Sequence, residues 1–337
     1  MTVLGIESSC DECAVAVVDD GRIVRSSVIH SQVENHKPFD GVVPELASRL
    51  HVEVVSSVYR RALSDAGVSV DDIDAIAVTN RPGLVGSLLV GVSFAKGLSF
   101  AMGKPLVGVD HILAHLYAVQ LETPMEYPHL GLLVSGGHTL VALVRGFDDI
   151  EVLGTTIDDA VGEAFDKVAK FYGLGYPGGR VIDDLAQMGD SEAFRFPSAR
   201  LDKGDHPFDV SYSGLKTAVL HQKDRFLAAG FEPTLPNLCA SFQKVAVDTL
   251  IRKVKAAAKV TGITRVVAGG GVAANSYLRT TLKKQRGWQV SYPSLSLCSD
   301  NAAMIAGWAY HAVSRGDRAD WSLNAESRVP RFKRKYP

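Results

Sequence analysis

The chain has 337 residues, of which 46% are hydrophobic and 22% charged, and its net charge is −1. This is the composition of an ordinary soluble globular protein, and it argues against a uniformly basic nucleic-acid-binding protein. Because one hydrophobic core seldom holds so long a chain, we expect two domains. The longest uncharged stretches, near residues 82–95 and 128–144, are broken by Gly, Pro or His, so no membrane span is expected.

Four cysteines, Cys10, Cys13, Cys239 and Cys298, are too few for a disulfide framework in a chain of this length. CDEC at 10–13 has redox or zinc spacing, but no second C-x-x-C accompanies it, so a packing role is favoured. The N-terminal residues run straight into a strand pattern and do not resemble a signal peptide. We therefore expect a cytoplasmic protein.

A strand-turn-strand-turn-strand pattern opens the sequence at residues 3–29 and returns at residues 130–157. Two such units predict an internal structural duplication. After the first unit, an amphipathic helix with Pro44 at its start is predicted over 44–66. It is followed by a predicted strand at 73–78, a Gly- and Ala-rich helix at 84–102 and a strand at 105–109.

The second half is expected to repeat this alternation around a helical insertion near 158–235. The elements predicted there are a turn at 176–180, a helix at 238–260, a strand at 265–271 and helices at 274–285 and 298–313. Such alternation indicates α/β layers around a largely parallel inner sheet.

Two similar α/β domains, with their leading hairpin turns at a shared cleft, are typical of the actin-like ATPase (ASKHA) fold. The N-terminal domain is predicted over 1–109 and is completed by the C-terminal helix, predicted over 300–337. The C-terminal domain is predicted over 110–299.

HILAH at 111–115 places two histidines four residues apart, on one face of a helix. The pair could bind one metal ion. The metalloprotease motif H-E-x-x-H carries its general base at the second position, where this chain has Ile112. The alternative is an amphipathic helix whose buried histidines are only hydrogen-bonded.

Glycine-rich turns suggest anion sites. In SGGH (135–138), glycines can adopt conformations that other residues resist, so that successive amides converge on an anion. GGGVAAN (269–275) is a similar candidate anion site between a strand and a helix, and RPGLVGS (81–87) is a third glycine-rich loop. Tight turns and close packing are the alternatives, and the sequence contains no P-loop.

These motifs together resemble those of the bacterial TsaD (Gcp) family, the tRNA N6-adenosine threonylcarbamoyltransferases, along essentially the whole chain. The motifs that carry the resemblance are GIESSCDE (5–12), GVVPELASRLH (41–51), PGLVGSLLVG (82–91), HILAH, LLVSGGHT (132–139), GEAFDK (162–167), YPGG (176–179), SYSGLKTA (211–218), GGGVAAN and CSDNAAMIA (298–306).

The resemblance implies an actin-like fold and transfer of threonylcarbamoyl from threonylcarbamoyl-AMP to N6 of the adenosine 3′ of the anticodon, in tRNAs reading ANN codons. It implies one divalent metal, iron or alternatively zinc, held by His111, His115 and Asp300. The residues that it implies for the adenylate are Val134, Ser135, Gly136, Gly137, His138, Asp166, Gly179, Asp183 and Asn275.

The implied roles are chemically reasonable. Two imidazoles and one carboxylate leave open positions on a metal, as catalytic sites require. Asp166 and Asp183 could accept hydrogen bonds from ribose hydroxyls. The alternatives are that Asp300 only caps a helix, and that Asp166 only pairs with Lys167 or Lys170.

Asp11 and Glu12, on the first hairpin turn, are candidate general bases by position. The resemblance departs at Asn80-Arg81, because the family commonly has Gly before this Pro, and at Cys13, where Thr is frequent. The family's bacterial members work with a TsaB-type paralogous subunit and a TsaE-type small ATPase, and the helix after Pro44 is a candidate interface.

Other functions are open to a chain of this pattern. An actin-like kinase or ATPase for a small metabolite needs no histidine pair, because such enzymes hold Mg²⁺ with carboxylates and water. A metalloprotease lacks its base at Ile112, and a nucleotide-binding scaffold has no use for a metal with open positions. The basic tail at 331–337 is either a nucleic-acid patch or a frayed terminus.

Overall fold

The computed structural model describes residues 1–199, 201, 207–222 and 234–329, so the basic tail at 331–337 lies outside the described residues. The chain divides into two compact units, Met1–Met125 with Pro293–Pro337, and Glu126–Tyr292. The divisions therefore follow Met125 and Tyr292, whereas the sequence suggested 109 and 299. The first shift arises because α4 (His111–Tyr117) and η3 (Ala118–Leu121) pack against α12 (Ala302–Ser314) within the first unit.

The first unit is built on a five-stranded sheet in the order β3-β2-β1-β4-β5. Strands β1 and β2 are antiparallel, as are β2 and β3, whereas β1, β4 and β5 run parallel. The sheet is thus mixed, because the short hairpin turns join only antiparallel neighbours. Its strands are β1 (Thr2–Glu7), β2 (Glu12–Asp19), β3 (Ile23–Ser31), β4 (Ala75–Arg81) and β5 (Leu106–Asp110).

Two long helices, α2 (Pro44–Ala66) and α3 (Val85–Met102), pack against each other and against the sheet. The predicted bounds of α2 are confirmed, because Pro44 begins the helix and Gly67, with φ of 64°, ends it. Shorter elements of this unit are α1 (Val33–His36), η1 (Lys37–Phe39), η2 (Val70–Asp72) and α11 (Leu295–Cys298).

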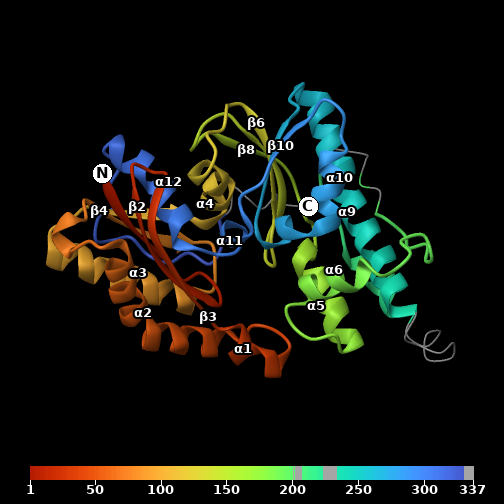
Figure 1. Ribbon diagram of the computed structural model, residues 1–337, viewed down its shortest axis with the longest axis horizontal. Helices are drawn as coiled ribbons and strands as arrows, with labels where there is room; N and C mark the ends of the chain where they lie inside the picture. Colours follow the sequence, from red (N-terminus) through yellow and green to blue (C-terminus); the bar gives the residue numbers. More distant parts are fainter. Residues whose placement is uncertain (200, 202–206, 223–233, 330–337) are drawn as a thin grey trace. The chain divides into compact units, whose positions relative to one another are not determined.

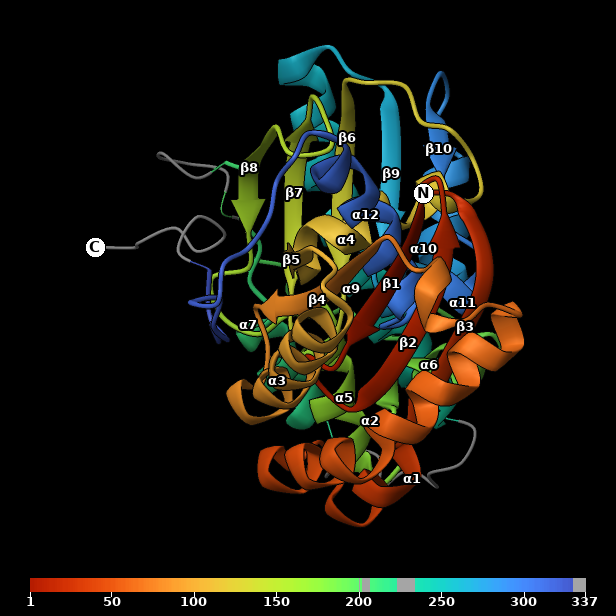
Figure 2. The same ribbon diagram turned by 90° about the vertical axis from the view of Figure 1, so that its left-hand side faces the viewer.

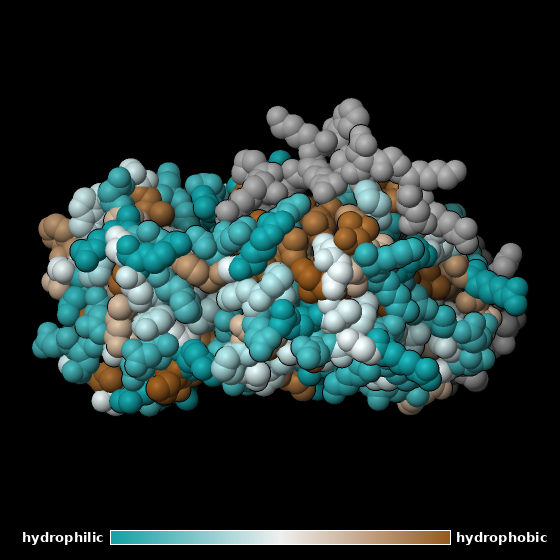
Figure 3. Space-filling view, turned by 90° about the horizontal axis from the view of Figure 1, so that it is seen from above, coloured by the Kyte–Doolittle hydropathy of each residue, from teal (hydrophilic) through white to brown (hydrophobic). Residues whose placement is uncertain are grey.

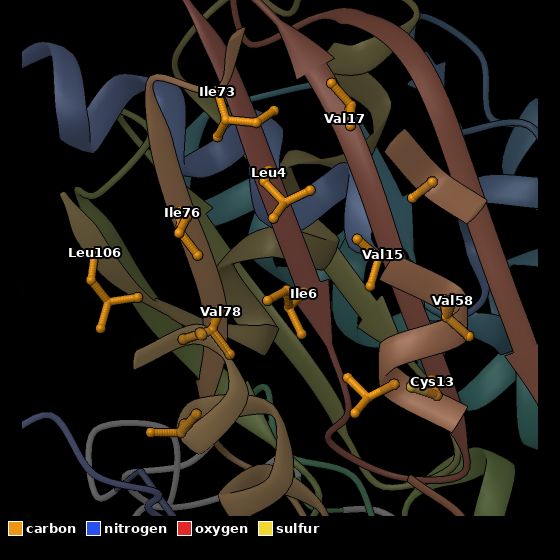
Figure 4. Close-up of a cluster of buried hydrophobic side chains, with 14 of the residues drawn as sticks. Leu4, Ile6, Cys13, Val15, Val17, Val58, Ile73, Ile76, Val78 and Leu106 are labelled. Atoms are coloured by element: carbon orange, nitrogen blue, oxygen red, sulfur yellow. The ribbon is translucent and has the colours of Figure 1, made fainter. Parts of the chain in front are cut away.

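Successive residues of β1 face opposite sides of this sheet. Leu4 and Ile6 belong to the buried cluster that also includes Val58 of α2 (Figure 4). Gly5 points the other way, where a Cβ atom would lie 2.3 Å from the carbonyl oxygen of Ala302 in α12. Because side chains alternate between the two faces of a sheet, these contacts show that α2 and α3 cover one face and α12 covers the other.

The second unit repeats this architecture. Its sheet has the order β10-β9-β6-β7-β8, and its hairpins β6-β7 and β7-β8 and parallel pairs β6-β9 and β9-β10 match those of the first sheet. Figure 2 shows β8, β7, β6 and β9 side by side. The strands are β6 (His129–Val134), β7 (Thr139–Val144), β8 (Ile150–Thr155), β9 (Arg265–Gly269) and β10 (Gln289–Ser291). The predicted duplication is confirmed.

The helices of the second unit include the expected insertion after β8. They are α5 (Val161–Tyr172), α6 (Gly178–Ala186), α7 (Ser213–Leu220), α9 (Thr234–Thr261), η4 (Gly271–Ala274) and α10 (Ser276–Lys283) (Figure 1). The predicted turn at 176–180 is shorter than expected, because Gly178 already begins α6.

The C-terminal helix is also shorter than predicted. It covers Ala302–Ser314 instead of reaching from 298 or 300 towards 337. Asn301 caps its start by accepting a hydrogen bond from the Met304 amide, and Gly316, with φ of 88°, lies just past its end. The described chain after this helix contains no further helix or strand.

Helix α3 is long and apolar enough to cross a membrane by length and composition, and it is the one such helix in the described chain. A single helix of this kind is weak evidence for a membrane span, and α3 packs on α2 and β4 within the first unit. On the face drawn in Figure 3, hydrophilic residues predominate and hydrophobic ones form separate patches.

Candidate metal centre and glycine-rich turns

Helix α4 begins directly after β5 and carries both histidines of HILAH. Its N-cap is Asp110, whose Oδ1 accepts hydrogen bonds from the amides of Ile112 (3.0 Å) and Leu113 (3.4 Å). His111 and His115 are 5% and 1% exposed. The cap fixes where the helix starts, and the helical spacing then puts both imidazoles on one face.

Asp300 completes a cluster with the two histidines. Its Oδ1 lies 3.1 Å from His115 Nε2 and 3.5 Å from His111 Nε2, and the two Nε2 atoms are 3.1 Å apart. Donors bound to one ion at about 2.1 Å are separated by about 3.0–3.4 Å for octahedral or tetrahedral angles. Because Asn301 caps α12, the interpretation of Asp300 as that helix's cap is wrong.

Glu7 stands behind this cluster and orients His111. Its Oε2 lies 3.0 Å from His111 Nδ1 and accepts a hydrogen bond from Thr79 Oγ1 at 2.6 Å. Its Oε1 accepts a hydrogen bond of 2.6 Å from the Ser9 amide. A carboxylate on the outer nitrogen leaves Nε2 as the ligand atom and increases its basicity. Sequence reasoning missed this role, although an acid inside an apolar strand was the available signal.

The charges of the cluster suit a cation. Burial lowers the pKa of His111, but Asp300 and Glu7 outweigh it and raise that pKa to about 9. Burial and the neighbouring His111 lower the pKa of His115, which favours the neutral imidazole that a metal requires. Two imidazoles and a carboxylate, backed by a second carboxylate, therefore fit a divalent metal such as iron or zinc.

Asp11 lies on the hairpin turn between β1 and β2, as predicted, whereas Glu12 is the first residue of β2. The hydroxyl of Ser31 donates to Glu12 Oε1 at 2.8 Å, and Glu12 Oε2 is buried without a hydrogen-bond partner in the described part of the chain. Burial, with Asp11 and Asp300, raises the pKa of Glu12 to about 7. Burial also raises the pKa of Asp11. A carboxylate with a pKa near neutrality can exchange protons at physiological pH.

In the second unit, Ser135 closes the turn between β6 and β7. Its amide donates to the His138 carbonyl at 2.8 Å, and its hydroxyl accepts from the His138 amide at 3.0 Å. Gly136 and Gly137 are exposed, and their amides donate to no group within the described residues. Neither has a positive φ, and a Cβ on either would meet nothing within 4 Å.

The expected reason for glycine at these two positions is therefore wrong. The fold itself does not require glycine at 136 and 137. A glycine that the protein's own packing leaves unexplained still permits a ligand to approach the backbone closely.

Gly270 is required by the fold. It has φ of 89°, and a Cβ there would lie 2.4 Å from the carbonyl oxygen of Val134. Leu133 pairs with Gly269 in the parallel β6-β9 ladder, so both glycine-rich turns follow the carboxyl ends of adjacent parallel strands. Ligands of α/β sheets bind at such strand ends.

Asp166 and Gly179 belong to the junction of α5 and α6. Asp166 Oδ1 accepts a hydrogen bond of 2.8 Å from the Gly178 amide at the start of α6. Its neighbour Lys167 pairs with Asp159 (2.6 Å) and Glu163 (2.8 Å). Gly179 lies in the first turn of α6, where a Cβ would meet nothing within 4 Å.

Asp183 and Asn275 share a hydrogen-bond network with Gln243 and Ser276. Asp183 accepts hydrogen bonds from Gln243 Nε2 (3.0 Å), the Ser276 amide (2.9 Å) and the Ser276 hydroxyl (2.7 Å). Asn275 Nδ2 donates to Gln243 Oε1 at 3.0 Å, and its Oδ1 caps α10. These two site candidates therefore also fix the turn after β9. Gln243, a buried amide in α9, was missed from the sequence.

Comparisons with solved structures define the class of protein. Full-length HypF in a phosphate- and nucleotide-bound form aligns with a TM-score of 0.61, at 16% identity, over 95% of this chain and 47% of that chain. Component A of the Acidaminococcus fermentans (R)-2-hydroxyglutaryl-CoA dehydratase aligns with a TM-score of 0.57 over 93% and 99% of the two chains, also at 16% identity. The duplicated mixed sheets and these neighbours define an actin-like ATPase fold.

Sequence comparisons identify the family within that fold. The family described as TsaD, tRNA N6-adenosine threonylcarbamoyltransferase, matches residues 23–307. Proteins of that name from Treponema denticola and Borreliella burgdorferi are 55% and 48% identical to this chain, over 99% and 100% of it and 99% and 96% of their own lengths. The chain belongs to the TsaD family and is an enzyme, a transferase. The predicted fold and family are confirmed.

Proposed function

We propose that this chain transfers the threonylcarbamoyl group of threonylcarbamoyl-AMP to N6 of the adenosine 3′ of the anticodon, in tRNAs that read ANN codons. The observation that carries the proposal is the convergence of buried His111 and His115 with partly buried Asp300, backed by Glu7, in a chain of the TsaD family. An actin-like kinase that holds Mg²⁺ would need carboxylates and water in place of an imidazole pair.

His111, His115 and Asp300 would hold one divalent metal, which we take to be iron, with zinc as the alternative. When bound, the metal would act as a Lewis acid that stabilises negative charge on a substrate oxygen. The protein's part is to keep His115 neutral and to orient His111 through Glu7.

The reaction requires little activation, because threonylcarbamoyl-AMP is a mixed anhydride with AMP as a good leaving group. The N6 nitrogen attacks the carbamoyl carbon, a C–N bond forms, and the bond from that carbon to the phosphate oxygen breaks. AMP leaves with the electron pair. The proton of N6 passes to the Glu12 carboxylate, with Asp11 as the second candidate for this role.

For the adenylate we propose the residues on and near the glycine-rich turns. The exposed amides of Gly136 and Gly137, next to Val134, Ser135 and His138, support an anion site, because they have no described partner. The further proposed contacts are Asp166, Gly179, Asp183 and Asn275.

Glu12→Gln is expected to change the pH dependence of transfer. A base must be ionised, so the wild-type rate should rise with pH through about 7 and level off above it. The variant should lose this limb and fall about tenfold to hundredfold in rate at pH 8. The variant should also be more stable than wild type at pH 8, because a carboxyl whose pKa is raised by folding opposes folding once it ionises.

Initial rates and urea unfolding at several pH values would test this prediction. Asp11→Asn belongs in the same series, and Glu151→Gln, which removes a carboxylate from an exposed ion pair with Arg145, is the control. If the transfer rate of Glu12→Gln equalled that of wild type and still rose through pH 7, the general base would be another group.

We also propose a cytoplasmic enzyme that works with a TsaB-type paralogous subunit and a TsaE-type small ATPase. Helix α2 buries Val55 and Val58 on its own sheet, while Glu53 and Arg60 are exposed on its other side. One side of α2 can thus pack in the core of its own unit while the other side binds the paralogous subunit.

Reversing charge at Glu53→Lys with Arg60→Glu is expected to weaken binding of the paralogous subunit by about tenfold or more, because like charges then meet across the interface. Isothermal titration with the purified subunit would measure the effect, and Arg25→Glu on β3 is the control. Unchanged affinity would exclude this face of α2.

The proposed function is tested by following labelled threonine into tRNA. The purified chain would be mixed with its proposed partners, threonylcarbamoyl-AMP and unmodified tRNA, and the label would be located by nuclease digestion. Label on the adenosine 3′ of the anticodon is the expected result. No label, with partners verified active, would reject the transferase and favour the small-metabolite kinase.

A further inference from the structure

The last three residues of β4 connect the metal centre to the C-terminal part of the chain. Thr79 donates to Glu7, the carboxylate that orients His111. Arg81 lies opposite Asp110 of β5, across an irregularity in the β4-β5 register. Asn80, between them, contacts the chain near its C-terminal end.

Arg81 faces Asp110, the residue that caps α4. We call α4 the metal helix, because it carries His111 and His115. Its Nε is 3.5 Å from Asp110 Oδ2, and the Asp110 side chain is only 2% exposed. The other carboxylate oxygen of Asp110 caps α4 through the amides of Ile112 and Leu113. The two atoms are too far apart for a hydrogen bond, and neither atom has a hydrogen-bond partner within the described residues, so Arg81 acts on Oδ2 by charge alone. Because Asp110 is buried, this attraction is weakly screened, and it holds the carboxylate whose second oxygen sets the start of α4 and the position of His111.

The chain segment after α12, Ala319–Glu326, lies along β4 and β5, and we call it the C-terminal strap. The Ala319 amide donates to Leu106 of β5 at 2.8 Å. The Glu326 amide donates to the Asn80 carbonyl at 2.9 Å, and Asn80 Nδ2 donates to the Asn324 carbonyl at 3.2 Å. Leu323 packs so closely over β5 that a Cβ on Gly108 would lie 2.6 Å from it.

The C-terminal strap also supplies a carboxylate to Arg81. Glu326 Oε1 is 3.5 Å from Arg81 Nη1, with side chains 49% and 36% exposed. Arg81 thus lies between a buried carboxylate at the metal helix and an exposed one on the strap. The exposed contact is the weaker of the two, because solvent screens it.

We propose that Arg81 and the C-terminal strap brace the metal helix, with Arg81 and Glu326 as positioning residues for the histidine pair. This inference rests on the proposed metal centre.

Co²⁺ binding to the full-length protein would test the brace without any dependence on transfer activity. The visible bands of bound Co²⁺ report ligand geometry, and a titration gives its affinity. Arg81→Met, which keeps length and removes charge, is expected to weaken Co²⁺ binding about threefold to tenfold and to alter these bands. Arg81→Lys should restore most of the loss.

Glu326→Gln is expected to weaken Co²⁺ binding about twofold, and combining it with Arg81→Met should add nothing to the single Arg81 change. Glu45→Gln, on an exposed pair away from α4, should leave binding unchanged. Circular dichroism would verify folding, and the exposed Glu326 variant tests the brace even if Arg81→Met fails to fold.

Wild-type affinity and bands in both Arg81→Met and Glu326→Gln would overturn the brace and leave the metal centre intact. Additive losses in the double variant would show that the two residues act separately, and would also overturn it. If the wild-type protein bound no Co²⁺, the proposed metal centre itself would fall, and the brace with it.

Discussion

Replacing His115 with alanine is expected to abolish tight metal binding and to lower the rate of threonylcarbamoyl transfer at least about a hundredfold. His115 Nε2 is the atom closest to both other donors, 3.1 Å from His111 Nε2 and 3.1 Å from Asp300 Oδ1. Its removal leaves one imidazole and one carboxylate, which is too few donors for a stable site. Asp300→Ala should have an effect of similar size.

The metal content of the purified protein, measured by mass spectrometry, and labelled-threonine transfer would test this expectation together. His129→Gln is the matched control, because it removes a buried histidine of the second unit that lies on β6. Full metal content in His115→Ala would show that the histidines of HILAH are buried and hydrogen-bonded but do not bind the metal. Lost metal with normal transfer would separate the metal from the reaction.

Gly5→Ala is expected to destabilise the protein and to weaken metal binding in one substitution. The new methyl group would lie 2.3 Å from the backbone oxygen of Ala302 and 2.9 Å from the Ala306 amide nitrogen, so α12 must shift. Overpacking of this kind costs about 1–3 kcal/mol. Asp300 lies two residues before Ala302, so the shift should also displace its carboxylate from the histidine pair.

Gly97→Ala is the matched control for Gly5→Ala, because it adds the same methyl group within α3. A Cβ on Gly97 would meet nothing within 4 Å, and alanine favours helix, so stability should rise by up to about 1 kcal/mol. Urea unfolding and Co²⁺ titration would compare the two variants. A Gly5→Ala protein as stable as wild type would show that α12 adjusts without cost.

The elements that the sequence predicted well are those whose ends carry their own chemical signals. Helix α2 runs from Pro44 to Ala66 as predicted, because Pro starts helices and Gly67 adopts the left-handed conformation that ends this one. The start of α12 was misplaced, because SDNA offers three possible caps and only tertiary structure selects Asn301. Local sequence therefore predicts where a helix lies more reliably than it predicts which of several similar residues caps the helix.

The candidate site divides in the same way. The i, i+4 spacing was enough to place His111 and His115 on one face of α4. Asp300 is 185 positions from His115, so only the resemblance could associate it with the pair. Glu7, Thr79 and Gln243 gain their roles through hydrogen bonds between distant segments. No local pattern marks Thr79 or Gln243, and for Glu7 the one local signal was an acid in an apolar strand.

The order in which a ribosome delivers these residues has a consequence for metal loading. His111 and His115 emerge early, but Asp300 follows 185 residues after His115. At about 5–20 residues per second, that delay is on the order of 10–40 s. During this time the nascent chain offers a histidine pair without its carboxylate. An ion that bound during this time would meet the two imidazoles alone. We therefore expect the selectivity that the full donor set provides to arise only after residue 300 has been made.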